Sequence, residues 1–173
     1  MYIDISDPTM VVLLGGVPPE EDNEFIIEYT GTIPGGSRLY YEDGKLYADI
    51  TQDKEEVKAN VNYNYSQAML KLKLEYPDVE TATWDKQERE ALAYRIDNTA
   101  PTPFIDGIVQ GRGIDKDELI AKILEKSDAL ASVTGYYTGV RQALEAQIDA
   151  ATTYSELQGI SFQVAAGLAT ELD

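Results

Sequence analysis

The spacing of apolar residues changes once along this chain, near residues 50 to 53, and this change constrains the fold more than any other feature. Before it, short apolar runs alternate with turns rich in glycine and proline, a pattern typical of strands. After it, apolar residues recur every three or four positions, as on one face of a helix. We therefore predict an α+β fold, with a small N-terminal antiparallel β-sheet module at 1–52 and an all-helical domain with one long helix at 53–173.

The clearest local signal in the first part is a β-hairpin. Two β-prone segments, residues 38–41 and 45–50, are joined by Glu42-Asp43-Gly44. Asp-Gly is the sequence of a tight hairpin turn, because glycine accepts a positive φ. A lone hairpin is marginally stable in water, so we expect one or two strands from the preceding runs, at 10–14 and 24–29, to join it in one small sheet.

The helical part opens with a stripe of apolar residues on one helix face. Its members, at spacings of three and four, are Val57, Val61, Tyr65, Ala68 and Leu72. This pattern predicts a helix from about residue 53 that ends near Tyr76-Pro77. A second helix is expected from Trp84 to Ile96 with Thr83 as its cap.

A short third helix is expected to open at Pro103, where the missing N–H costs nothing, and to close at Gly111 and Gly113. The longest helix is predicted from Asp115 to Ala151, about 35 residues. Its stripe of apolar residues is Leu119, Ile123, Leu130, Val133, Tyr137, Val140, Leu144 and Ile148.

Gly135 and Gly139 fall inside the long helix. They indicate either close approach of a neighbouring helix or a kink or short break near Gly135, and the sequence leaves both open. Thr153 and Glu156 form a capping-box pattern for a short final helix. Residues 160–173 carry no clear signal.

The chain contains neither cysteine nor histidine, which removes much of catalytic chemistry. Disulfides, thiolate nucleophiles, histidine-based triads and the usual zinc sites are all excluded. Gly111-Arg-Gly113 lacks the remaining residues of a nucleotide-binding loop, and Asp115-Lys-Asp117-Glu118 begins a helix, where acids are expected, rather than forming a calcium loop. We predict no catalytic residue, no cofactor and no metal. A hydrolase based on two carboxylates remains the weakest alternative.

The net charge of the chain is 14 − 31 = −17, and both parts are acidic. Such a field repels phosphate backbones and anionic membrane surfaces, and no segment reaches the roughly 20 apolar residues of a membrane span. No secretory signal is recognisable at the start, so we expect a cytoplasmic protein that binds neither nucleic acid nor membrane.

Tyrosine is the unusual residue, with 12 tyrosines against 3 phenylalanines and 1 tryptophan. Tyrosine is favoured at protein interfaces because it combines a large apolar area, few rotatable bonds and a hydroxyl group. The alternative is that each ring fills the edge of a core. We select as candidate protein-binding residues Tyr40, Tyr41, Tyr47, Tyr63 and Arg112.

Several segments together resemble small bacteriophage tail-fibre assembly proteins. They run Trp84-Asp-Lys-Gln-Glu-Arg-Glu-Ala-Leu-Ala-Tyr94, Ala100-Pro-Thr-Pro-Phe-Ile-Asp-Gly107, Gly111-Arg-Gly113, Gly139-Val-Arg-Gln142 and Ile148-Asp-Ala-Ala151. The resemblance covers residues 80–158, roughly 45% of the chain, whereas the first 50 residues match nothing in that family. Its motif residues are Trp84, Gln87, Glu90, Ala91 and Tyr94. Four of them, Trp84, Gln87, Ala91 and Tyr94, fall at helical spacing, which is equally that of residues packed against the long helix.

This resemblance implies a β-rich N-terminal part, a helical C-terminal part and a chaperone role. The implied partner is the phage tail-fibre protein, whose folding and trimerisation the chaperone assists without ATP, nucleotide or metal, in the host cytoplasm during virus assembly. The alternative is a structural virion component, such as a fibre or baseplate adaptor that stays in the particle. The long helix additionally makes self-association through helices an expectation.

Overall fold

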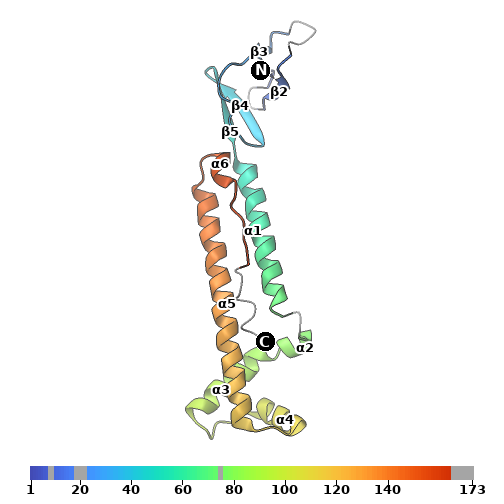
Figure 1. Cartoon of the computed structure of the whole chain (residues 1–173), viewed down its shortest axis with the longest axis vertical. Coiled ribbons are helices and arrows are strands. Elements are labelled where there is room, and N and C mark those ends of the chain that lie inside the picture. Colours follow the sequence, from blue (N-terminus) through green and yellow to red (C-terminus); the bar gives the residue numbers. More distant parts are fainter. Residues whose placement is uncertain (8–9, 18–22, 74–75, 165–173) are drawn as a thin grey trace. The chain divides into compact units, whose positions relative to one another are not determined.

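The computed structural model describes residues 1–7, 10–17, 23–73 and 76–164, and Figure 1 traces its elements. Antiparallel strands come first and helices follow, which confirms the predicted α+β fold class. The strands are β1 (Tyr2–Asp4), β2 (Val12–Gly15), β3 (Ile26–Glu28), β4 (Arg38–Glu42) and β5 (Lys45–Asp49). The helices are α1 (Thr51–Lys71), α2 (Asp78–Thr81), α3 (Trp84–Ile96), α4 (Pro103–Arg112), α5 (Lys116–Ala150) and α6 (Tyr154–Leu157).

The predicted hairpin is confirmed. Strands β4 and β5 pair in register from Arg38 opposite Asp49 to Glu42 opposite Lys45. The two loop residues, Asp43 and Gly44, have φ values of 48° and 79°. Positive φ at both central residues is the geometry of a type I′ turn, which matches the twist of the strands it joins.

The expectation of a single sheet was wrong. The strands form a three-stranded sheet in the order β2-β1-β3 and a separate two-stranded sheet, β4-β5. The first sheet is centred on β1, which uses both of its edges and which the sequence had not indicated as a strand. One backbone hydrogen bond links the sheets, from Val11 N to Leu39 O at 2.9 Å.

Both sheets share one small core. Its buried residues are Ile3, Val11, Tyr29, Leu39 and Leu46. The hydroxyl of Tyr29 accepts a hydrogen bond from Leu46 N and donates one to Thr32 O, each at 3.2 Å. Tyr29 therefore satisfies a hairpin amide from within the core, which ties the β4-β5 hairpin to the preceding chain.

Contacts group the chain into two compact units, Met1–Asn62 with Gln142–Phe162, and Tyr63–Arg141 with Gln163–Asp173. Helices α1 and α5 each contribute to both units. The predicted domain boundary, between residues 52 and 53, lies in the first turn of α1, whereas the compact units divide between residues 62 and 63. The predicted boundary stays a prediction.

The face predicted for α1 is the less exposed one. Val61 and Ala68 are buried, and Val57, Tyr65 and Leu72 are half-buried. The helix ends at Lys71, before the predicted end at Tyr76-Pro77. The short helix α2 follows, which the sequence analysis did not anticipate.

The long helix is present as predicted and runs unbroken for 35 residues (Figure 1). Gly135 and Gly139 therefore mark no break in it. A Cβ atom added at either position would meet nothing within 4 Å among the described residues, so close helix approach does not explain them either. Both glycines are exposed.

Helices α3 and α4 occupy the predicted segments, with Pro103 at the start of α4 and Gly113 as its left-handed cap (φ 64°). Gly111 lies inside α4 rather than closing it. The predicted side-chain cap by Thr83 was wrong, because its backbone is already helical and its hydroxyl donates to Glu80 O at 2.7 Å. The capping box of Thr153 and Glu156 is confirmed at α6. Of the unassigned stretch, residues 160–164 are non-helical, and 165–173 lie outside the described residues.

Candidate functional site

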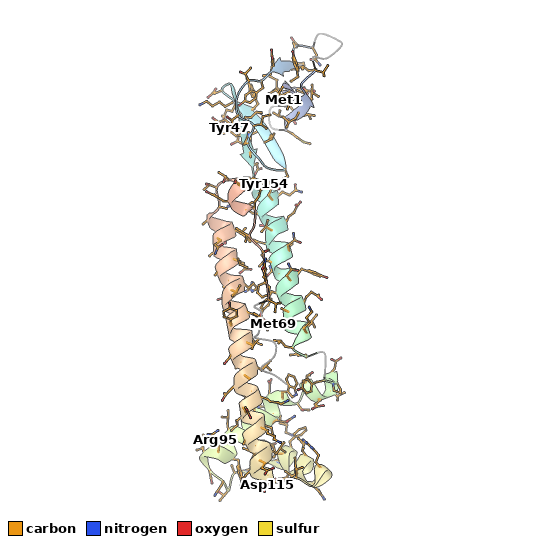
Figure 2. All side chains as sticks on the ribbon, in the orientation of Figure 1. Met1, Tyr47, Met69, Arg95, Asp115 and Tyr154 are labelled. Atoms are coloured by element: carbon orange, nitrogen blue, oxygen red, sulfur yellow. The ribbon has the colours of Figure 1, made fainter. Side chains whose placement is uncertain are left out.

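The hairpin register places Tyr40 directly opposite Tyr47. Their rings stack with centroids 5.3 Å apart and an interplanar angle of 17°. Tyr47, labelled in Figure 2, is exposed, and Tyr40 is half-buried. Cross-strand aromatic pairs of this kind stabilise a hairpin and present a flat apolar area with polar tips.

Tyr41 has a different setting. It is opposite Leu46, it is half-buried, and it packs against the core of the β-strand module. The structure thus divides the three hairpin tyrosines into a stacked pair, Tyr40 and Tyr47, and a third ring, Tyr41, that serves packing.

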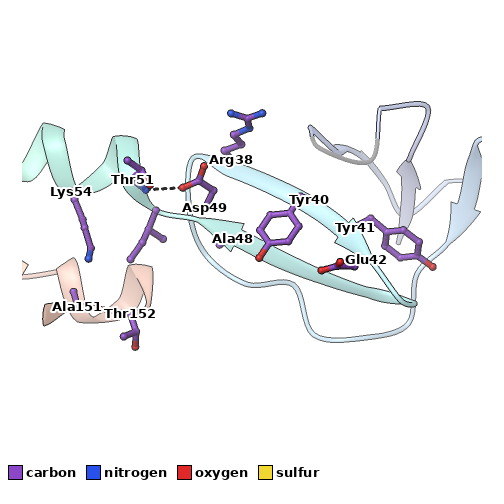
Figure 3. Close-up of a pocket in the computed structure, with 11 residues that line it drawn as sticks. Arg38, Tyr40, Tyr41, Glu42, Ala48, Asp49, Thr51, Lys54, Ala151 and Thr152 are labelled. Atoms are coloured by element: carbon purple, nitrogen blue, oxygen red, sulfur yellow. Dashed lines mark hydrogen bonds between the residues drawn. The ribbon is translucent and has the colours of Figure 1, made fainter. Parts of the chain in front are cut away.

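Beside the pair lies a hollow of about 720 Å³, open to solvent (Figure 3). We call it the hairpin hollow. It is formed by the hairpin, the start of α1 and the residues that follow α5. Its lining residues are Arg38, Tyr40, Tyr41, Glu42, Ala48, Asp49, Ile50, Thr51, Lys54, Ala151 and Thr152.

Hydrogen bonds fix several residues that line the hairpin hollow where β5 meets α1. The carboxylate of Asp49 accepts a bond from Thr51 N at 3.0 Å (Figure 3). Hydrogen bonds from the side chain and backbone of Thr51 lower the pKa of Asp49, and Arg38 adds a smaller effect in the same direction. The ammonium group of Lys54 donates to Asp149 O at 2.9 Å.

Asp149, which accepts the bond from Lys54, also forms an ion pair. Lys58 Nζ is 2.8 Å from Asp149 Oδ1, which joins α1 to the end of α5 within one compact unit. The hydrogen bond between them raises the pKa of Lys58 and lowers the pKa of Asp149. Nearer the start of α1, Asp53 accepts bonds from Ser37 N and Ser37 Oγ, both at 3.0 Å, and so anchors the chain that leads into β4.

The hairpin hollow combines aromatic rings, hydroxyl groups and charges of both signs in an open depression. Small-molecule sites are usually more enclosed and mostly apolar. An open, mixed surface with stacked tyrosines is typical of contact with another polypeptide. The features of this surface are therefore closer to those of a protein interface than to those of a small-molecule site.

The other two candidate binding residues lie elsewhere. Tyr63 is exposed on α1 and Arg112 is exposed near the end of α4. Neither lines the hairpin hollow. Both belong to the compact unit that does not contain the hairpin.

The motif residues of α3 mostly make packing and capping contacts. Trp84 meets Tyr76 edge-on with centroids 5.1 Å apart, and Gln87 Nε2 donates to Thr83 Oγ1 at 2.9 Å. Ala91 is fully buried in a cluster that includes Ile105. Tyr94 lies under the ammonium group of Lys116 at 4.5 Å. A hydrogen bond to Asp117 raises the pKa of Tyr94.

Glu90 has a role that sequence reasoning missed. Its carboxylate accepts hydrogen bonds from Phe104 N and Ile105 N, each at 3.0 Å, at the first turn of α4. Thr102, at the cap position, makes no side-chain capping bond to a backbone N–H of that turn, and its hydroxyl instead donates to Asp106 Oδ1 at 3.1 Å. A carboxylate of α3 therefore caps α4 and also complements its helix dipole. Spacing along one helix gives no signal for such a contact.

The described part of the chain contains no group of three or more acidic side chains arranged to hold a metal ion. Within those same residues, no helix has the length and apolar character needed to span a membrane.

Fold and site together define a small α+β protein with an open, tyrosine-bearing surface. A family model described as the HI1402 helical domain matches residues 125–161, about a fifth of the chain, from within α5 to just beyond α6. No curated protein and no solved structure matches the chain.

Proposed function

We propose that this chain is a non-catalytic, ATP-independent chaperone that binds a phage tail-fibre protein and assists its folding and trimerisation. The observation that carries the binding role is the stacked pair of Tyr40 and Tyr47 beside the open hairpin hollow. The fibre as partner is supported by the resemblance of residues 80–158 to tail-fibre assembly proteins.

The charge of the chain favours a particular kind of client surface. With a net charge of −17, it attracts basic patches and repels acidic ones. Exposed tyrosine rings offer apolar contact area without making the chaperone itself insoluble. Such a surface suits an apolar or basic part of a fibre subunit that stays exposed until the trimer buries it. The proposed place of action is the host cytoplasm during virus assembly.

Co-expression with the tail-fibre protein from the same virus tests this proposal. We expect the soluble yield of fibre to rise when the wild-type chain is present. The double variant Tyr40→Ala/Tyr47→Ala should lose that effect while keeping its helical circular dichroism. Tyr136→Ala is the matched control, since it removes an exposed tyrosine of α5 that does not line the hairpin hollow. A fibre yield that does not change when the chain is omitted contradicts the proposal.

Mass spectrometry of purified virus particles separates the chaperone from a structural component. A chaperone that is released after trimerisation is missing from the particles. An adaptor that remains on the fibre or baseplate is found there in fixed proportion to the fibre.

A further inference from the structure

Strand β2 and its flanks expose an unusual amount of apolar surface. The exposed fractions of Val12, Leu13 and Leu14 are 51%, 42% and 43%, and those of Met10 and Val17 are 61% and 78%. Neighbouring strand residues point to opposite faces of a sheet. Exposure of all three successive side chains means that β2 is covered on neither face.

Strand β2 is also an edge of its sheet, since the strand order is β2-β1-β3. Hydrogen bonds from Ile5 N to Phe25 O and from Tyr29 N to Met1 O show that the odd-numbered residues of β1 direct their backbone groups toward β3. Asp4 must therefore direct its groups toward β2, where it pairs with Val12.

The next residue, Leu13, consequently directs its N–H and C=O away from β1. The bond from Val11 N to Leu39 O points the same way, as expected for a residue two positions earlier. Within the described residues, Leu13 N and O have no hydrogen-bond partner on that side. An incoming strand would find a donor and an acceptor there.

Native proteins usually defend such edges with lysine, proline or inward-pointing charges. Residues 10–17 read Met-Val-Val-Leu-Leu-Gly-Gly-Val and contain no charge. Within the described residues the edge is interrupted by a register irregularity opposite Tyr2 and Ile3, and by the bond that Val11 N donates to Leu39 O two positions before Leu13. An apolar, uncharged edge of this kind is suited to strand addition.

The negative charge around β2 favours one kind of partner strand over another. The first 50 residues carry 10 acids and 2 bases, a net charge of −8. A second copy would bring another −8 to the same edge, so self-pairing is opposed by repulsion. A strand from a different protein, apolar at alternate positions and flanked by basic residues, meets no such penalty.

We propose that β2 is a docking edge that adds one extended, basic-flanked strand of a partner protein to the β2-β1-β3 sheet, with the backbone of Leu13 as the central pairing point. This inference deepens the proposed function and rests on it, because the strand belongs to the client.

A synthetic peptide, Lys-Val-Thr-Val-Thr-Val-Thr-Lys, serves as the probe with the full-length chain. Fluorescence anisotropy measures binding, and hydrogen exchange reports on the Leu13 amide. We expect the peptide to bind and to slow exchange at Leu13. Methylation of the peptide's backbone nitrogens should weaken binding about tenfold or more, because it removes the donors of the added ladder. A glutamate-flanked version should also bind more weakly.

The variant Leu13→Pro removes the outward donor and leaves the ladder to β1 intact, so it should fold and lose peptide binding to a similar degree. Tyr136→Ala is the control, since it removes an exposed tyrosine of α5 that is not among the candidate binding residues, and it should bind normally. The methylated peptide keeps the test decisive if Leu13→Pro does not fold. Absence of peptide binding, equal binding of the methylated peptide, or a dimer that Leu13→Pro dissociates would each overturn the docking edge.

The two proposals fail separately. Fibre solubilisation without peptide binding rejects the docking edge alone. Peptide binding without any effect on fibre yield rejects the chaperone role and leaves the edge as a strand-binding site for another partner.

Discussion

Gly135 and Gly139 lie in the interior of α5 with open space where a Cβ atom would be. Glycine in an exposed helix interior costs up to about 1 kcal/mol relative to alanine, chiefly through backbone entropy. We expect Gly135→Ala and Gly139→Ala each to raise the free energy of unfolding by about 0.5–1 kcal/mol. Urea titration followed by circular dichroism measures this.

Gly113→Ala is the matched control, because Gly113 also has open space around it but adopts a φ of 64°. Alanine is strained in this left-handed conformation, so the variant should lose about 1 kcal/mol or more. If Gly135→Ala and Gly139→Ala instead lowered the free energy of unfolding, as Gly113→Ala is expected to, α5 would require glycine at these positions.

Glu156 makes stability depend on pH at α6. Hydrogen bonds from the backbone N–H groups of Thr152 and Thr153 lower its pKa from the ordinary value of 4.5. A carboxylate with a lowered folded-state pKa contributes stability above its unfolded pKa and loses that contribution as the pH falls through the folded value. The stability difference between wild type and Glu156→Gln should therefore be constant above pH 4.5 and shrink below it.

Urea titrations of both proteins from neutral pH down to pH 3 measure that difference. Because other carboxylates titrate equally in the two proteins, their effects cancel. A difference that stays the same at every pH would mean that the charge of Glu156 does not contribute.

At the scale of elements, the sequence predicted what depends on short-range rules. The Asp43-Gly44 turn fixed the hairpin and its register, and that register alone brings Tyr40 opposite Tyr47. Helices α1, α3, α4, α5 and α6 followed from apolar spacing and capping residues. The central strand β1 and the short helix α2 carry too few residues to show a period.

The missed parts of the site depend on contacts between distant segments. The hairpin hollow requires Lys54 and Ala151, almost 100 positions apart, to border the same space. Glu90 caps α4 from 14 positions away. Neither arrangement leaves a mark in local spacing, because each arises only when the helices pack.

The Glu90 cap gives a prediction about α4. Its removal leaves two N–H groups of the first turn without their partner. We expect Glu90→Ala to lower the free energy of unfolding by about 1–2 kcal/mol. Hydrogen exchange should quicken at Phe104 and Ile105 in particular.

Glu125→Ala provides the control for this change, since Glu125 is exposed on α5. Its effect should lie within about 0.5 kcal/mol of zero. Equal effects of the two substitutions would refute the capping role of Glu90.

At the scale of the whole molecule, net charge dominates the electrostatics. The chain carries −17, and the described ion pairs are all partly exposed and individually weak. Added salt should weaken the repulsion among the acidic side chains more than it weakens the attraction within these ion pairs. We expect the urea midpoint to rise between about 0.01 M and about 0.15 M salt, where the Debye length falls from about 30 to about 8 Å. Sodium and potassium chloride should act alike, and a falling midpoint would refute the argument.

The join between β5 and α1 has a mechanical consequence. Strand β5 ends at Asp49 and α1 begins at Thr51, so the buried Ile50 alone separates them. The carbonyl of Ile50 already accepts the first bond of the helix, from Lys54 N at 2.9 Å. No flexible linker separates the strand from the helix. A force applied to the hairpin would act directly on the first turn of α1, so stretching in an optical trap should show the hairpin and the start of the helix unfolding in one event.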